Sequence, residues 1–196
     1  MAETLPTRPS LLVRLRDPGD QEAWRTFLDL YGPLIYAFGR KHGLQDADAA
    51  DLTQAVLAAV HGSIGRLDYD PARGTFRGWL YGVARNQLGK WRRSQGKDRA
   101  SGDTEQLNQL AELPAPDDAA DWWEYEYQRR CFLVASERVR PQVQESSWHA
   151  FWWTAVDGRP PSDVAVELQL SLGALYTAKS RVLALIKKEI QNLVEE

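Results

Sequence analysis

Apolar side chains recur at three- and four-residue steps along most of the chain, the spacing that predicts amphipathic helices. One such stripe runs from Trp24 to Phe38, a second from Leu52 to Ile64, and a third from Phe76 to Trp91. Asp20 is the expected N-cap of the first helix, whereas Gly32-Pro33 predicts a kink or a restart within it. No window alternates polar and apolar residues for long enough to indicate a strand.

The second half of the chain predicts further helices. One covers residues 122–140, and Pro141 is expected to begin the next, which carries apolar residues from Trp148 to Ala155 at helical spacing. A short helix over 161–168 and a longer one over 172–193 follow, separated by a tight turn at 169–171. The expected fold class is therefore all-α.

A segment of different composition lies between the two helical halves. Residues 98–121 are poor in aromatic and β-branched residues and contain Pro114 and Pro116, a composition that predicts a flexible linker. The net charge of −3 divides into +4 for residues 1–97, −8 for residues 98–128 and +1 for residues 129–196. We therefore expect a domain over 1–97, an acidic linker over 98–121 and a second domain over 122–196.

Several classes of function are not indicated by the sequence. Cys131 is the only cysteine, so neither an internal disulfide nor a multi-cysteine metal site can form. His42, His61 and His149 are isolated, and no Gly-rich phosphate loop or catalytic acid pair is present. No apolar run approaches the roughly 18 residues of a membrane span, and residues 1–10 lack a signal-peptide pattern. We expect a cytoplasmic protein that is not an enzyme and that uses no metal or cofactor.

The segment 161–193 has the spacing of a helix-turn-helix, in which the second helix enters the major groove of DNA. Apolar positions fall where two crossing helices would pack, and the small Ala165 lies where they would approach most closely. Gln169 occupies a turn position that often requires Gly, at a cost on the order of 1 kcal/mol. The side chains expected to point away from the packed face, and so toward DNA, are Tyr176, Thr177, Ser180 and Arg181. A plain helical hairpin would show the same spacing.

Basic and aromatic residues are interleaved along residues 76–93, a mixture that suits single-stranded nucleic acid through stacking and phosphate contacts. Alternatively, the aromatic residues form core and the basic residues a solvated face, the interpretation we favour for Phe76 and Trp79. Asn86 is different, because an amide on a partly apolar face needs a hydrogen-bond partner.

Two stretches of the sequence resemble a known family. FRGWLYGVARNQL, preceded by DAADLTQAVLAAVHGSI, is similar to region 2 of the extracytoplasmic-function sigma factors, the small class of bacterial sigma factors. PSDVAVELQLSLGALYTAKSRVL is similar to their region 4. The resemblance covers about residues 21–93 and 122–189, in the order in which the family has them.

The resemblance implies roles for particular residues. Those that match the family's polymerase-binding pattern are Asp51, Leu52, Gln54 and Val56, with Ala55 where the family has Glu. Those that match the stretch recognising the −10 promoter element are Arg73, Arg77, Arg85, Asn86, Lys90, Arg92 and Arg93. Asn86 stands at the position that lines the pocket for an extruded base. Tyr176, Thr177, Ser180 and Arg181 match the helix that recognises the −35 element.

The resemblance thus implies a sigma factor that binds core RNA polymerase, recognises the −10 and −35 elements of promoter DNA and promotes DNA opening. An anti-sigma factor is a further partner that the family admits. The acidic linker would be drawn into positively lined polymerase channels, or it is a solvated spacer. Two other functions stay open: a free-standing helix-turn-helix regulator, and a degenerate sigma factor that acts as an interaction protein.

Overall fold

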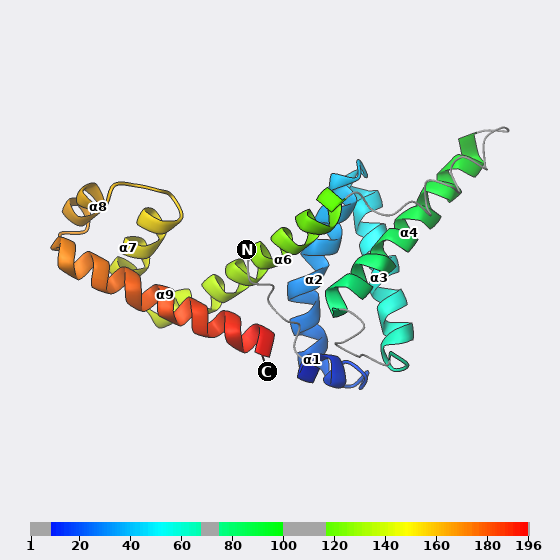
Figure 1. Ribbon diagram of the computed structural model, residues 1–196, viewed down its shortest axis with the longest axis horizontal. Coiled ribbons are helices and arrows are strands. Elements are labelled where there is room, and N and C mark those ends of the chain that lie inside the picture. Colours follow the sequence, from blue (N-terminus) through cyan, green and yellow to red (C-terminus); the bar gives the residue numbers. More distant parts are fainter. Residues whose placement is uncertain (1–8, 68–74, 100–116, 196) are drawn as a thin grey trace. The chain divides into compact units, whose positions relative to one another are not determined.

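The computed structural model describes residues 9–67, 75–99 and 117–195 (Figure 1). These residues form helices joined by short turns and contain no strand, which confirms the expected all-α fold. They divide into two compact units, unit 1 over Met1–Arg130 and unit 2 over Cys131–Glu196. The expected loop at 68–74 and most of the expected linker lie outside the described residues. None of the described helices is long and apolar enough to cross a membrane.

Unit 1 contains α1 (Pro9–Arg14), α2 (Gln21–Lys41), α3 (Asp46–Ile64), α4 (Phe76–Arg99) and the first part of α6 (Asp117–Val139). The helix α3 packs against both α2 and α4. The predicted apolar stripes form the core of this unit, whose buried members include Phe27, Phe38, Leu52, Val56, Val60, Leu80 and Ala84. A side chain at Gly39 would stand 3.2 Å from atoms of Ala49 and Leu52, so glycine allows α2 and α3 to approach closely.

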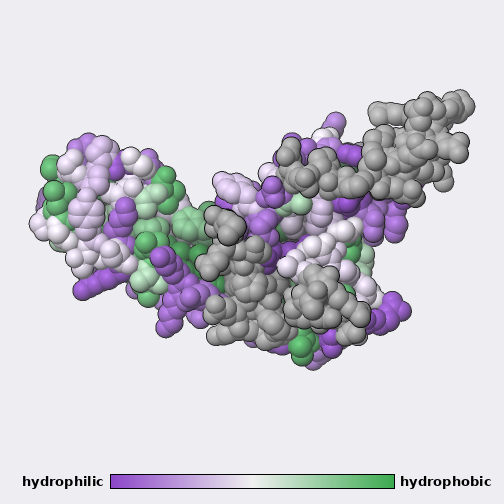
Figure 2. Space-filling model, viewed as in Figure 1, coloured by the Kyte–Doolittle hydropathy of each residue, from purple (hydrophilic) through white to green (hydrophobic). Residues whose placement is uncertain are grey.

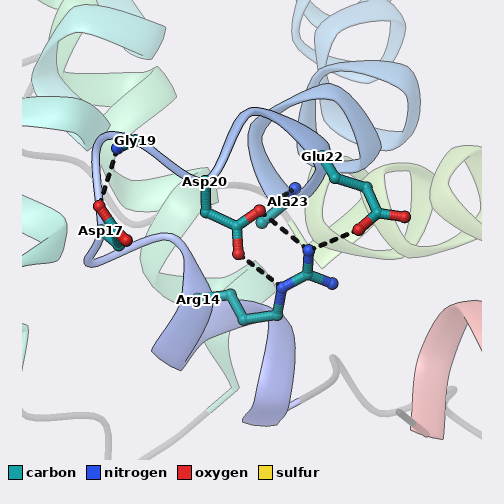
Figure 3. A network of polar contacts seen from close by, with 6 residues as sticks. All are labelled: Arg14, Asp17, Gly19, Asp20, Glu22 and Ala23. Atoms are coloured by element: carbon teal, nitrogen blue, oxygen red, sulfur yellow. Dashed lines mark hydrogen bonds and ion pairs between the residues drawn. The ribbon is translucent and has the colours of Figure 1, made fainter.

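The start of α2 is held by the predicted N-cap (Figure 3). The Asp20 carboxylate accepts a hydrogen bond from the backbone N–H of Ala23 at 3.0 Å, which satisfies one unpaired donor of the first turn. Arg14 donates to both carboxylate oxygens of Asp20, at 2.7 and 2.9 Å, and to Glu22 at 2.9 Å. The Arg14 and Ala23 hydrogen bonds lower the pKa of Asp20 from its ordinary 3.8 to about 2. The same contacts tie α1 to the beginning of α2.

The helix α2 continues through Pro33, so the expectation that it could restart there is wrong. Proline has no N–H to donate, which leaves the carbonyl of Asp29, four residues earlier, without its helical partner. The Nε of Arg130, on α6, donates to that carbonyl at 2.8 Å. A side chain from another helix thereby replaces the missing backbone hydrogen bond.

The first part of α6 packs within unit 1. Tyr127 is 1% exposed and stacks on Tyr31 of α2, with ring centroids 5.5 Å apart. Trp123 is 3% exposed and meets Phe38 edge to face at 5.6 Å. Unit 1 therefore extends to Arg130, beyond the expected end of the first domain at residue 97. Residues 98–99 and 117–121, which we expected to be linker, are helical.

Unit 2 contains the second part of α6, a 3-10 turn (Arg140–Gln142), α7 (Glu145–Ala155), α8 (Pro161–Glu167) and α9 (Leu172–Glu195). Pro141 lies in the 3-10 turn rather than at the start of α7, because Val143 and Gln144 are extended and separate the two elements. Its core includes the buried residues Phe151, Val164, Ala165, Leu175, Val182 and Ile186. Ala165 is thus buried among the packed helices, as its small size predicted.

The turn between α8 and α9 is closed by two backbone hydrogen bonds. The N–H of Leu170 donates to the carbonyl of Ala165 at 2.9 Å, and that of Gln169 donates to Val166 at 3.1 Å. This pair of hydrogen bonds requires a residue in the left-handed conformation just after the helix, and Gln169 has a φ of 56°. The end of α2 is closed in the same way, with Gly43 at a φ of 85°. Gln169 therefore occupies the glycine-favouring position that the sequence indicated.

Candidate polymerase and nucleic-acid interface

The four expected polymerase-binding residues lie on two different faces of α3, one buried and one exposed. Leu52 and Val56 are 2% and 0% exposed and form part of the core of unit 1. Asp51 and Gln54 are exposed, as their position off the apolar stripe predicted. A partner can therefore reach Asp51 and Gln54, whereas Leu52 and Val56 hold α3 in place.

Charge is segregated between α3 and α4. The sequence of α3 contains three Asp residues and no Lys or Arg. The sequence of α4 contains seven basic residues and one acidic residue. Because α3 packs between α2 and α4 in one compact unit, unit 1 offers an acidic helix and a basic helix side by side. The basic α4 attracts phosphate groups, whereas the acidic α3 repels them.

The expected −10 residues lie in different environments along α4. Asn86, Lys90 and Arg92 are exposed, and Arg85 and Arg93 are partly exposed. Asn86 makes no side-chain hydrogen bond to another described residue. Gly82, one turn earlier, has open space where a side chain would stand. The side-chain amide of Asn86 is therefore available to a ligand. Arg73 lies outside the described residues.

Arg77 is the exception among the expected DNA contacts, because it is 1% exposed. Its Nε donates to the Oε2 of Glu124 on α6 at 2.9 Å, and its guanidinium lies 4.6 Å from the centroid of the Tyr127 ring. Removing Arg from water is costly unless a carboxylate and further contacts compensate, and α6 supplies both. In this structure Arg77 holds α6 on α4 and is not presented to DNA.

A basic cluster near the end of α2 was not found from the sequence. Burial lowers the pKa of His42, and the charges of Arg92, Lys41 and Arg85 act in the same direction, whereas a backbone hydrogen bond to Phe38 opposes them. The positive charges of Lys41, at the end of α2, and of Arg85 and Arg92, on α4, therefore act on His42 together. The signal available in sequence was the Arg-Lys-His run at the end of α2, and spacing alone did not connect it to α4.

The four expected −35 residues gather on one face of α9. Tyr176, Thr177, Ser180 and Arg181 are exposed, while Leu175 and Val182 are fully buried on the opposite side. With Ala184 they line one shallow depression of about 460 Å³. The order of α8, the closed turn and α9 matches that of a helix-turn-helix, with this face of α9 turned outward.

Comparison with known families agrees with the arrangement of unit 1. Residues 27–98 match the family model of sigma-70 region 2, a span that includes α3, most of α2 and nearly all of α4. The chain therefore contains a sigma-70 region 2 domain, and the match supports membership of the sigma-70 family. It also supports a sigma-factor role in promoter recognition, which involves core RNA polymerase and promoter DNA. No curated protein matches the chain.

Proposed function

We propose that this protein is an extracytoplasmic-function sigma factor that binds core RNA polymerase, recognises the −10 and −35 elements and promotes DNA opening. The observation that carries the proposal is Asn86 on a strongly basic helix inside the sigma-70 region 2 match, exposed and with no side-chain hydrogen bond to another described residue. The helix-turn-helix order of unit 2 supports the −35 assignment, because α8 and α9 follow the region 2 match in the chain, after α6 and α7. Acting with polymerase would place the protein in the cytoplasm.

In this proposal the two faces of unit 1 perform different tasks. Asp51 and Gln54 on α3 bind a polymerase surface that complements their acidic helix. Lys90, Arg92 and Arg85 on α4 attract the phosphates of promoter DNA. The amide of Asn86 offers both donors and an acceptor, so it can bind the Watson–Crick edge of a base once pairing is broken. Binding energy from that contact favours the opened DNA.

Unit 2 has the duplex-binding task in this proposal. The outward face of α9 enters the major groove of the −35 element, where Arg181 can bind guanine and Ser180 a base or a phosphate. Arg181 forms no ion pair with another described residue, so its guanidinium is available. By contrast, Arg138 of the same unit is engaged by Glu189 at 3.0 Å.

The experiment that tests the proposal compares DNA binding with and without core polymerase. Purified protein is added to labelled promoter DNA selected from a random library by the reconstituted holoenzyme, and complexes are resolved by gel shift. We expect a specific shift only when core polymerase is present. A specific shift by the protein alone would favour a free-standing regulator, and binding to core without any DNA shift would favour an interaction protein.

A further inference from the structure

The outward face of α9 is partly apolar. Leu172 and Tyr176 are 49% and 52% exposed, and Leu183 is 37% exposed. Steps of four and seven residues separate them, which places them along one side of the helix. Figure 2 shows hydrophobic residues among hydrophilic ones on the surface of unit 2. A row of large apolar side chains in water indicates a binding surface more than a single exposed one would.

The depression on this face combines apolar groups with the hydroxyl of Ser180 and one cation. Tyr176 contributes a ring, Thr177 and Ala184 contribute methyl groups, and Arg181 contributes a guanidinium. The hydroxyl of Thr177 donates to the carbonyl of Gly173 at 2.9 Å, so its proton is already used. In this arrangement Thr177 presents its oxygen and its methyl group to a ligand rather than its hydroxyl proton.

The charge of α9 identifies the occupant as duplex DNA. Residues 172–188 include Lys179, Arg181, Lys187 and Lys188 and no acidic residue. A helix of uniform positive charge matches the two phosphate backbones that border the major groove. Among the bases, thymine alone presents a methyl group in that groove. The apolar part of the depression at Tyr176 and Thr177 is therefore complementary to a thymine.

We propose that Tyr176 and Thr177 form a contact for the 5-methyl group of a thymine in the −35 element. Arg181, on the next turn beside Thr177, then lies over a neighbouring base pair, where guanine suits it. The proposal rests on the proposed function, since it requires α9 to bind promoter duplex. It adds to that function the base feature that these side chains distinguish.

Replacing thymine by deoxyuridine tests this contact, because uracil pairs identically and lacks only the methyl group. The holoenzyme first selects its −35 element, and each thymine of both strands is then replaced singly. At one position we expect binding to weaken roughly 3- to 5-fold, the loss associated with one buried methyl group. Tyr176→Ala holoenzyme should bind thymine and uracil templates equally at that position, and Thr177→Ser should show a reduced difference.

Val166→Ala is the matched control, because Val166 is 80% exposed on α8 and lies outside the depression. This variant should retain the full uracil effect. The inference is overturned if the selected element contains no thymine, if uracil has no effect at any position, or if the effect persists unchanged in Tyr176→Ala. Failure to select any −35 element would instead contradict the proposed function itself, so the two failures are distinguishable.

Discussion

Two polar residues of α4 have opposite environments. Arg77 is 1% exposed and is held by a carboxylate and an aromatic ring, whereas Asn86 is exposed and its side chain makes no hydrogen bond to another described residue. Replacing Arg77 would leave Glu124 without its partner, but replacing Asn86 would leave no buried group unsatisfied. Stability and function should therefore separate cleanly at Asn86.

Asn86→Ala should form holoenzyme and a closed promoter complex but should form few open complexes on duplex DNA. The reason is that an extruded base would lose its hydrogen bonds to the amide, while α3 and α9 are unchanged. Permanganate footprinting of unpaired thymines measures opening, and a template already unpaired across the −10 element should recover part of the defect.

Gln87→Ala is the control for that experiment, because it removes an amide from the neighbouring, partly exposed position of the same helix. It should open promoters normally. The unfolding free energy of Asn86→Ala, measured by thermal melting, should stay within about 0.5 kcal/mol of that of the parent protein. Normal opening by a folded Asn86→Ala protein would exclude Asn86 from the base contact.

Gln169→Gly should stabilise unit 2 by about 0.5–1 kcal/mol. Gln169 has a φ of 56°, a conformation that glycine adopts without the steric cost borne by other residues. Glycine also gains freedom in the unfolded chain, which offsets part of the benefit. Thermal unfolding measures the change, and Gln169→Ala, which keeps the steric cost, should leave stability nearly unchanged. Destabilisation by glycine would mean that the Gln169 side chain contributes more than the local strain.

Local rules explain which residues could be anticipated from the sequence. The N-cap at Asp20 and the glycine-favouring turn at Gln169 depend on neighbours within a few positions, and both were predicted. The burial of Arg77 was not, because its partners Glu124 and Tyr127 come from a helix beyond the expected linker. Arg77 could be recognised in the sequence, but Glu124 could not be identified as its partner.

Among the helices, α3 has its two sides assigned to different tasks. Asp51→Arg should weaken binding to core polymerase strongly, and Gln54→Ala should weaken it moderately, because both side chains are exposed on an acidic helix. Neither change should alter unit 1 stability by more than about 0.5 kcal/mol. Co-purification with core polymerase, beside thermal melts, measures both quantities. Core binding equal to that of the parent would place the polymerase contact elsewhere.

A partly buried ion pair contributes to the docking of α6 within unit 1, beside the aromatic contacts of Tyr127 and Trp123. Glu124→Ala should lower the unfolding free energy of unit 1 by about 2–3 kcal/mol, since it removes the carboxylate to which the buried Arg77 guanidinium donates at 2.9 Å. Glu126→Ala is the matched control two residues later. Its partner Arg129 is 53% exposed, so that pair should contribute less than about 1 kcal/mol. Equal effects of the two changes would show that α6 is not fixed through Arg77.

The helices themselves followed from apolar periodicity, but the border between the units did not. Trp123, Tyr127, Cys131 and Val134 continue one buried stripe along α6, although the border falls between Arg130 and Cys131. An apolar stripe predicts that one face of a helix is buried, but it does not predict which unit that face packs in. Of the two alternatives expected at Pro33, a kink or a restart, the restart was wrong for a related reason, because the compensating donor Arg130 lies far away in the sequence.

For the whole molecule, the distribution of acidic residues matters more than the net charge of −3. The segment 98–128 carries −8, and the structure places a large share of that charge on α6 rather than in the connection. Its first part contains Asp117, Asp118, Asp121, Glu124 and Glu126 and no basic residue before Arg129. Unit 1 therefore contains an acidic helical segment beside its basic α4. Phosphates approaching α4 meet both fields.

The intact protein should accordingly bind duplex DNA weakly without polymerase. Neutralising Asp103, Glu105 and Glu112 together, as Asp→Asn and Glu→Gln, removes three negative charges from the connection without changing its length. We expect non-specific affinity at low salt to rise roughly tenfold and the gain to disappear near 0.5 M salt, where charges are screened within a few ångströms. Transcription with core polymerase should fall, because the connection would be attracted less to positively lined channels.

Shuffling residues 100–116 at constant composition is the control and should preserve both properties. Fluorescence anisotropy over a salt series measures binding, and tight, salt-resistant binding by the unaltered chain would favour a regulator that acts without polymerase.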